Sequence, residues 1–116
     1  MDLILKKTLL YDFYGDLLTD RQKRIYEEVF LNDYSQSEVA KDEGISRQGV
    51  NDMIRRVNKQ LEYYENTLHL VEKFMAVKAR IADIRLTART ENASLEDLST
   101  SMKNIDRIAS EILEEL

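Results

Sequence analysis

Apolar residues recur at intervals of three and four along most of the chain, the spacing that places them on one face of a helix. The first run covers residues 3–17 and predicts a core helix. A second run covers residues 20–32 and a short third one residues 35–43, and Tyr34 between them is expected to pack inward. The pattern therefore predicts an all-α fold. The apolar face of the first helix consists of Leu3, Ile4, Leu5, Leu9, Leu10, Phe13 and Leu17.

A longer run begins at Arg47 and predicts a long fourth helix packed against something continuous. If this helix does not run through, it is expected to break at Asn66–Thr67, and its apolar spacing slips by one position after about residue 74. A last helix follows Ser94, and the short link before it predicts antiparallel pairing with the preceding helix. The apolar positions of the fourth run are Val50, Ile54, Val57, Leu61, Tyr64, Leu68, Val71 and Met75.

Capping residues mark where these helices begin and end. Thr19 has Gln22 three positions later, a capping-box spacing in which each side chain accepts a hydrogen bond from the other's free backbone N–H. Gly44 is expected to end the third helix because glycine readily takes a positive φ. The candidate N-caps are Thr19, Ser35, Ser46 and Ser94.

Composition limits the available chemistry. The 116 residues include no cysteine, which excludes disulfides, thiolate metal sites and a cysteine nucleophile and favours a reducing, cytoplasmic compartment. The single histidine, His69, has no second histidine or spaced carboxylate with which to bind a metal or act as a base. The three glycines form no phosphate-binding loop, and the N-terminal apolar run is too short and too charged to cross a membrane. We expect a non-enzymatic protein with no metal and no cofactor.

Residues 35–54 follow the pattern S-x-x-E-V-A-x-x-x-G-I-S-x-x-x-V-x-x-x-I, which is typical of a helix-turn-helix. Ala40 would let the two helices approach, Gly44 would make the turn, and Ile45 would fix the angle. In such a unit the second helix inserts its N-terminal residues into the major groove of DNA while the first helix braces it. The predicted nucleic-acid-binding residues are the outward polar ones, namely Ser46, Arg47, Gln48, Asn51, Arg55, Arg56 and Lys59.

Charge weakens this interpretation. The chain carries a net charge of -5, and residues 33–46, which include the bracing helix, sum to -3. Affinity for DNA comes largely from Lys and Arg neutralising phosphates. Asp52 among the contact positions, and Glu38, Asp42 and Glu43 on the bracing helix, would oppose it. The alternative is that the outward residues form a solvated helix face.

A resemblance to region four of bacterial sigma factors, which reads the minus-thirty-five promoter element, covers residues 18–61, LTDRQKRIYEEVFLNDYSQSEVAKDEGISRQGVNDMIRRVNKQL. A wider span is similar to the YlxM family, small sigma-region-four-like proteins of Gram-positive bacteria encoded beside the signal recognition particle GTPase. This span runs from YDFYGDLLT through ISRQGVNDMIRR to LEYYENTLHLVEKF, which ends at residue 74. The C-terminal forty residues match the family less clearly.

The YlxM resemblance implies a protein of DNA-binding type with a part in the signal recognition particle pathway of membrane-protein targeting. Its partner would be the particle's RNA or its GTPase, and it would modulate GTP turnover or assembly. The sigma-like contact positions correspond to Arg47, Gln48, Asn51 and Arg55. The rival interpretation is a sequence-specific transcription regulator that uses the same face on a DNA duplex.

Two parts are expected: a helix-turn-helix domain over residues 1–66, with its core at 19–61, and a C-terminal helical arm over residues 67–116. The apolar stripe of the arm exceeds what one small domain needs to cover, so we expect a partner-binding element and a homodimer. The alternatives are that the arm folds back onto the first helix, or that the protein is a scaffold acting through the arm alone. The predicted dimer interface consists of Leu98, Met102, Ile105, Ile108 and Ile112.

The chain has six tyrosines, which could stack against the bases of single-stranded RNA. Their spacing favours packing in the core and at its edges instead. They are Tyr11, Tyr14, Tyr26, Tyr34, Tyr63 and Tyr64.

Overall fold

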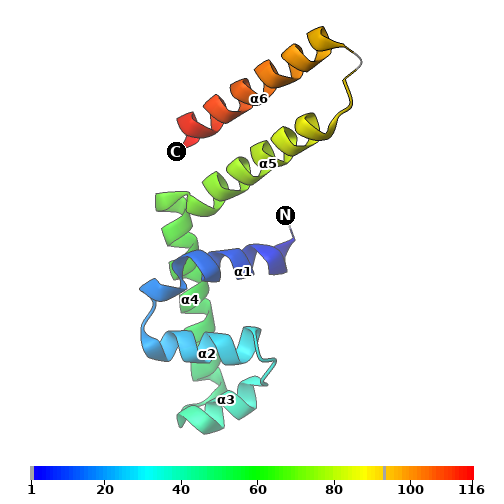
Figure 1. The fold of residues 1–116 in the computed structure, drawn as a ribbon. Helices are drawn as coiled ribbons and strands as arrows, with labels where there is room; N and C mark the ends of the chain where they lie inside the picture. The colour runs from blue at the N-terminus through cyan, green and yellow to red at the C-terminus, as the bar shows by residue number, and fades with distance from the viewer. Residues whose placement is uncertain (1, 93) are drawn as a thin grey trace. The chain divides into compact units, whose positions relative to one another are not determined.

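The computed structural model describes residues 2–92 and 94–116, which form six α-helices and one short 3-10 turn, with no strand among them (Figure 1). The predicted all-α class is confirmed. The chain divides into two compact units, Met1–His69 and Leu70–Leu116. The first contains α1 (Leu3–Tyr14), the 3-10 turn η1 (Gly15–Leu17), α2 (Asp20–Phe30), α3 (Gln36–Glu43) and α4 (Arg47–Leu68), and the second contains α5 (Leu70–Arg89) and α6 (Leu95–Glu115).

In the N-terminal unit, α4 is the helix on which the others pack, since α1, α2 and α3 all contact it (Figure 1). Apolar residues recur along α4 at alternating intervals of four and three, so one side of this helix stays in the core over about three turns. Burial of each of these side chains contributes about 1.5 to 3 kcal/mol relative to leaving it in water. The predicted stripe at Val50, Ile54, Val57 and Leu61 is confirmed.

Tyrosines join α1 and α2 to α4. The ring of Tyr11 stacks on that of Tyr26 with centroids 5.3 Å apart, and the Tyr26 hydroxyl donates to Asn58 Oδ1 on α4 at 3.1 Å. Burial raises the pKa of Tyr26. Tyr14 is also buried, and its hydroxyl donates to Glu65 at 2.6 Å. Core packing is therefore confirmed for Tyr14 and Tyr26, but the inward packing predicted for Tyr34 is wrong, because Tyr34 is 47% exposed.

The first helix is shorter and more exposed than its apolar pattern predicted. α1 ends at Tyr14, and the 3-10 turn η1 carries the chain to Leu17. Leu10 and Tyr14 are buried on α1, whereas five of the seven residues of the predicted face are exposed. A helix buries only the stripe that meets another element, and α1 lies across the side of α4. The exposed residues are Leu3, Ile4, Leu5, Phe13 and Leu17.

The turn between α3 and α4 has the predicted geometry. Gly44 adopts a φ of +68°, a left-handed conformation that glycine takes at no steric cost. The amide of Ile45 donates to the carbonyl of Ala40 at 3.0 Å, and the Ser46 hydroxyl accepts from the amide of Gly49 at 2.9 Å. These bonds end α3 and begin α4 three residues after the glycine, so the helix-turn-helix prediction is confirmed.

The fourth helix ends at Leu68, not at Asn66–Thr67, and it does not continue to Met75. His69 takes a left-handed conformation with a φ of +57°, and its amide donates to the carbonyl of Glu65 at 2.8 Å. The predicted run extended past Leu68 to Met75 because apolar residues also recur at helical spacing along α5. The boundary between the two units lies at His69, three residues after the expected domain end.

The C-terminal unit is an antiparallel pair of helices, as predicted (Figure 1). Ser94 accepts from the amide of Asp97 at 3.1 Å and begins α6, which confirms this N-cap. Arg80 on α5 lies 3.3 Å from Glu111 and 3.7 Å from Glu115 on α6. Across the described part of the chain, no helix is long and apolar enough to cross a membrane.

Candidate nucleic-acid interface

The candidate interface lies on the side of α4 opposite its buried stripe. Because Val50, Ile54 and Val57 face the core, helix geometry turns the positions between them outward. Asn51 is half-buried, and every other predicted contact residue is exposed. The exposed ones are Ser46, Arg47, Gln48, Arg55, Arg56 and Lys59.

The basic residues on this side of α4 are not neutralised by the protein. Among the described residues, none lies within ion-pair distance of Arg47, Arg55, Arg56 or Lys59. Since α4 rises about 1.5 Å per residue, these four charges extend over roughly 18 Å of its surface. They remain available to a partner that carries negative charge.

Four of the six other basic residues of the N-terminal unit, namely Lys6, Arg21, Lys23 and Arg24, are paired with carboxylates. Lys6 lies 3.3 Å from Glu62, and Lys23 donates to Asp16 at 2.9 Å. The bond to Asp16 raises the pKa of Lys23. Because their charges are offset, these residues contribute less to the positive electrostatic potential around the protein than the number of basic residues in the sequence suggests.

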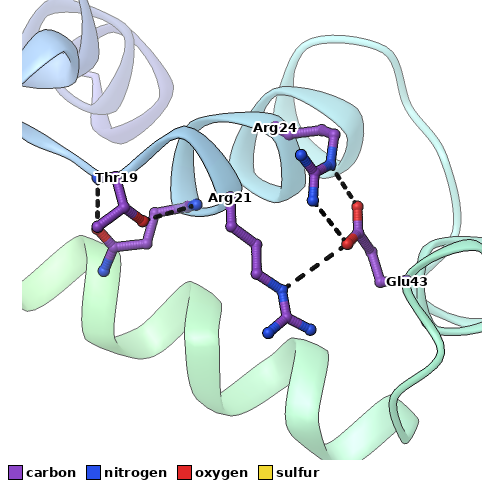
Figure 2. Close-up of polar contacts among 5 residues, drawn as sticks. Thr19, Arg21, Arg24 and Glu43 are labelled. Carbon is purple, nitrogen blue, oxygen red and sulfur yellow. Dashed lines mark hydrogen bonds and ion pairs between the residues drawn. The ribbon is translucent and has the colours of Figure 1, made fainter.

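The strongest of these pairs lies at the end of the bracing helix. Arg24 donates to Glu43 through Nε at 2.6 Å and Nη2 at 2.8 Å, and Nε of Arg21 lies 3.8 Å from the same carboxylate (Figure 2). The hydrogen bond from Arg24, and then the charges of Arg24 and Arg21, hold the pKa of Glu43 below its ordinary value of 4.5. Both arginines come from α2, so this cluster ties α2 to the last residue of α3, immediately before the turn (Figure 2).

The Glu43 cluster changes the charge argument made from the sequence. The sequence alone makes Glu43 one of the acids that would oppose a polyanion, but its charge is offset by two guanidinium groups, and only 10% of its side chain is exposed. Sequence reasoning missed this cluster. The available signal was the pair of arginines three positions apart, which share one face of α2.

Gln48 and Asp52 interact on the exposed side of α4. Nε2 of Gln48 donates to Oδ1 of Asp52 at 2.9 Å, one helical turn away. The Gln48 amide is therefore partly occupied, and the Asp52 carboxylate holds a negative charge beside the basic residues. A nucleic acid that contacted Gln48 would have to compete with this bond.

Ser46 serves as the N-cap of α4. Its oxygen accepts from the amide of Gly49, which leaves the hydroxyl proton available for a phosphate at the positive end of the helix dipole. This local bond also orients the first turn of α4, where Arg47 and Gln48 lie.

Sequence reasoning also missed the exposure of Tyr63. This side chain is 66% exposed and lines a shallow depression with Lys59 and Asn66 on α4. Among the described residues, its ring has one aromatic contact, an edge contact with Tyr64 at 6.1 Å. An aromatic ring beside a lysine is the combination that single-stranded nucleic acids use for base stacking and phosphate contact.

Within residues 2–92 and 94–116, no three His, Cys, Asp or Glu residues lie close enough together to hold a metal ion.

Known proteins resemble this chain over most of its length. The UPF0122 family, described as "Putative helix-turn-helix protein, YlxM / p13 like", matches residues 1–105. A UPF0122 protein of Caldanaerobacter subterraneus is 50% identical over 78 residues, which is 67% of each chain. One from a Thermoanaerobacter species is 41% identical over 107 residues, covering 92% of this chain and 91% of that protein. One from Streptococcus agalactiae is 39% identical over 97 residues, covering 84% and 87%.

Proposed function

Because the chain belongs to the UPF0122 family of helix-turn-helix proteins, we propose that it is a non-enzymatic protein that binds nucleic acid through the exposed side of α4. The observation that carries this proposal is the row of four basic residues without an ion-pair partner among the described residues, on the helix that follows the turn. Net acidity of the chain does not oppose it strongly, because counterion release depends on local contacts with phosphates. The interface consists of Ser46, Arg47, Gln48, Asn51, Arg55, Arg56 and Lys59.

We further propose that the protein is an accessory of the signal recognition particle pathway that contacts the particle's RNA or its GTPase. This choice of partner rests on the resemblance to YlxM proteins. Tyr63 supports RNA as the ligand, because an exposed ring at the end of a basic row suits an unpaired base, whereas a duplex keeps its bases stacked.

The test of nucleic-acid binding is fluorescence anisotropy with the particle's RNA at several salt concentrations. Each phosphate contact that is lost should reduce the salt slope by about 1, so we expect the double variant Arg55→Ala/Arg56→Ala to reduce it by about 2. Lys23→Ala is the matched control, since Lys23 already has Asp16 as a partner, and it should leave the slope unchanged. Absence of binding by the unaltered protein at low salt would contradict the proposal.

A second experiment tests the partner. A lysate pull-down with the full chain should enrich the particle's RNA or its GTPase, and adding the protein should change GTP turnover. If the RNA is the ligand, Tyr63→Ala should weaken its binding by about 1 to 3 kcal/mol, the usual value of one base stacked on an aromatic ring. If neither RNA nor GTPase is enriched and turnover does not change, the pathway proposal is wrong, although the nucleic-acid proposal stands on its own test.

The geometry of the turn favours one alternative function, a sequence-specific transcription regulator. Arg47, Gln48 and Asn51 lie in the first turns of α4, where a recognition helix contacts base edges in the major groove. For such a regulator, Arg47→Ala should cost about 1 to 3 kcal/mol at one base position of a preferred duplex. Equal binding to all duplexes would exclude this alternative.

A further inference from the structure

The α5–α6 pair has two unlike sides. On one side, polar and charged residues of both helices line a common groove. Arg80 bridges this groove to Glu111 and Glu115. The residues that line it are Arg80, Asp83, Leu86, Thr87, Asn104, Arg107, Ile108 and Glu111.

Apolar residues follow the groove residues directly in sequence on both helices. Ile81 comes after Arg80 on α5, and on α6 Ile105 comes after Asn104 and Ile112 after Glu111. Consecutive residues lie about 100° apart around a helix. Arg80 and Glu111 meet across the contact between the two antiparallel helices. One further step in the same sense on each helix therefore carries Ile81 and Ile112 past this contact to the other side of the pair.

Large apolar side chains are exposed on this second side, which we call the apolar side. Ile81 on α5 is 47% exposed, and on α6 Leu98 and Met102 are 42% and 64% exposed. Leu113 and Leu116, farther along α6 on the same side, are also exposed. Apolar groups gathered in this way are typical of a protein contact surface.

Opposite charges border the apolar side. Its α5 edge carries Lys78, Arg85 and Arg89, and its α6 edge carries Asp106 with Lys103 beside it. All five are exposed, and Lys78 lies over the ring of Phe74. Among the described residues, none lies within ion-pair distance of these five charges.

The positions of these charges along the helices also match. Arg80 lies level with Glu111, and Thr87 and Asn104 line the same groove. Counting one residue per 1.5 Å on each antiparallel helix therefore puts Arg85 level with Asp106. The edges are too far apart within one pair of helices for these charges to meet.

We propose that a second copy of this chain covers the apolar side, with a two-fold axis parallel to the helices. The two copies then form an antiparallel four-helix bundle in which α5 of each copy packs against α6 of the other. This operation keeps every residue at its height, so Arg85 of one copy meets Asp106 of the other. A two-fold axis across the helices would instead place α5 on α5 and bring like charges together.

The proposal corrects the sequence-based interface. Ile108 is only 6% exposed in the single chain, because it lies inside the α5–α6 pair, and it is not available to a second copy. Leu98 and Met102 remain in the interface. Ile105 and Ile112, both half-buried, lie at its base.

The first experiment measures the molar mass of the full chain by light scattering after size-exclusion chromatography. The unaltered protein should have twice the mass of one chain, and Met102→Asp should reduce it to one. Leu86→Asp is the matched control, because Leu86 is 68% exposed, like Met102, but lies on the groove side. A monomeric unaltered protein, or an equal effect of both substitutions, would overturn the proposal. Circular dichroism checks that both variants keep their helices.

The second experiment tests the charge register. Arg85→Glu places two acids opposite each other on both sides of the four-helix bundle, and Asp106→Arg places two bases there, so each variant alone should dissociate at least tenfold more readily. Mixing the two variants should restore the dimer, because each mixed dimer then contains two opposite-charge pairs. Pairing within a chain would not respond to mixing. An unchanged dimer in either single variant, or a mixture no tighter than its components, would overturn this arrangement.

Discussion

The two units of this protein differ in how much of their apolar surface they bury. In the N-terminal unit, each of the four α-helices contributes buried side chains to a core along α4. In the C-terminal unit, Val71 and Ile108 are the buried apolar residues among those described, while large apolar side chains on both helices are exposed. A small pair of helices with so little core generally needs another surface for stability. The N-terminal unit thus has a core of its own, whereas the C-terminal unit leaves much of its apolar surface exposed.

The largest effect is expected from a substitution in the core of the N-terminal unit. Leu61→Ala removes a side chain that is 1% exposed and should lower the free energy of unfolding by about 2 to 5 kcal/mol. All six tyrosines lie between residues 11 and 64 and the chain has no tryptophan, so tyrosine fluorescence during urea unfolding reports this unit alone. Tyr63→Ala, at an exposed position on the same helix, should change the free energy of unfolding by less than about 0.5 kcal/mol.

The second effect concerns the C-terminal unit. Ile108→Ala should destabilise the α5–α6 pair by about 2 to 4 kcal/mol, because a buried isoleucine is lost. Helical circular dichroism should then fall at temperatures where tyrosine fluorescence is unchanged. If both signals shift together, the two units unfold as one and the comparison fails.

A smaller effect tests the cluster that ties α2 to α3. Glu43→Gln should lower the stability of the N-terminal unit by about 1 kcal/mol, since it removes one partner of a bidentate, charge-assisted pair with exposed arginines. Asp42→Asn makes the same change of charge at the neighbouring exposed residue and should have no measurable effect. Tyrosine fluorescence in urea is again the measurement.

The same pair predicts a pH dependence. The pKa of Glu43 is lower in the folded protein than its ordinary value of 4.5, so its contribution is fully present above that value and is lost as the pH falls through the folded pKa. The difference in stability between the unaltered protein and Glu43→Gln should therefore shrink below about pH 4.5. A difference that stays constant down to pH 2 would show that the carboxylate charge is not responsible.

The smallest effect leaves both units intact. Asp52→Asn removes a negative charge from the exposed side of α4 and should strengthen nucleic-acid binding about fivefold at low salt, the equivalent of about 1 kcal/mol between charges in water. Both unfolding signals should stay the same. Anisotropy with the same RNA gives the affinity, and an unchanged value would mean that Asp52 does not face the ligand.

Features that depend on neighbouring residues in the sequence were predicted correctly, and features that depend on contacts between distant elements were not. The starts of α2 and α6, the end of α3 at Gly44 and the buried stripe of α4 were all predicted correctly. Three predictions were wrong: the burial of the first helix's apolar face, the inward packing of Tyr34 and the position at which the fourth helix ends. The outward position of most contact residues followed from helix periodicity, but the state of their charges did not, because it depends on partners on other helices.

The sequence by itself determined the helices, their caps and the turn before α4, because a capping bond joins residues three positions apart and a glycine's φ depends on its own backbone. Only the tertiary structure decided which charges are neutralised and which apolar residues are covered. Glu43 meets Arg24 across 19 positions of sequence, and Ile108 is buried while Met102 on the same helix is exposed. Both outcomes depend on which elements approach one another in space, and spacing along a single helix does not contain that information.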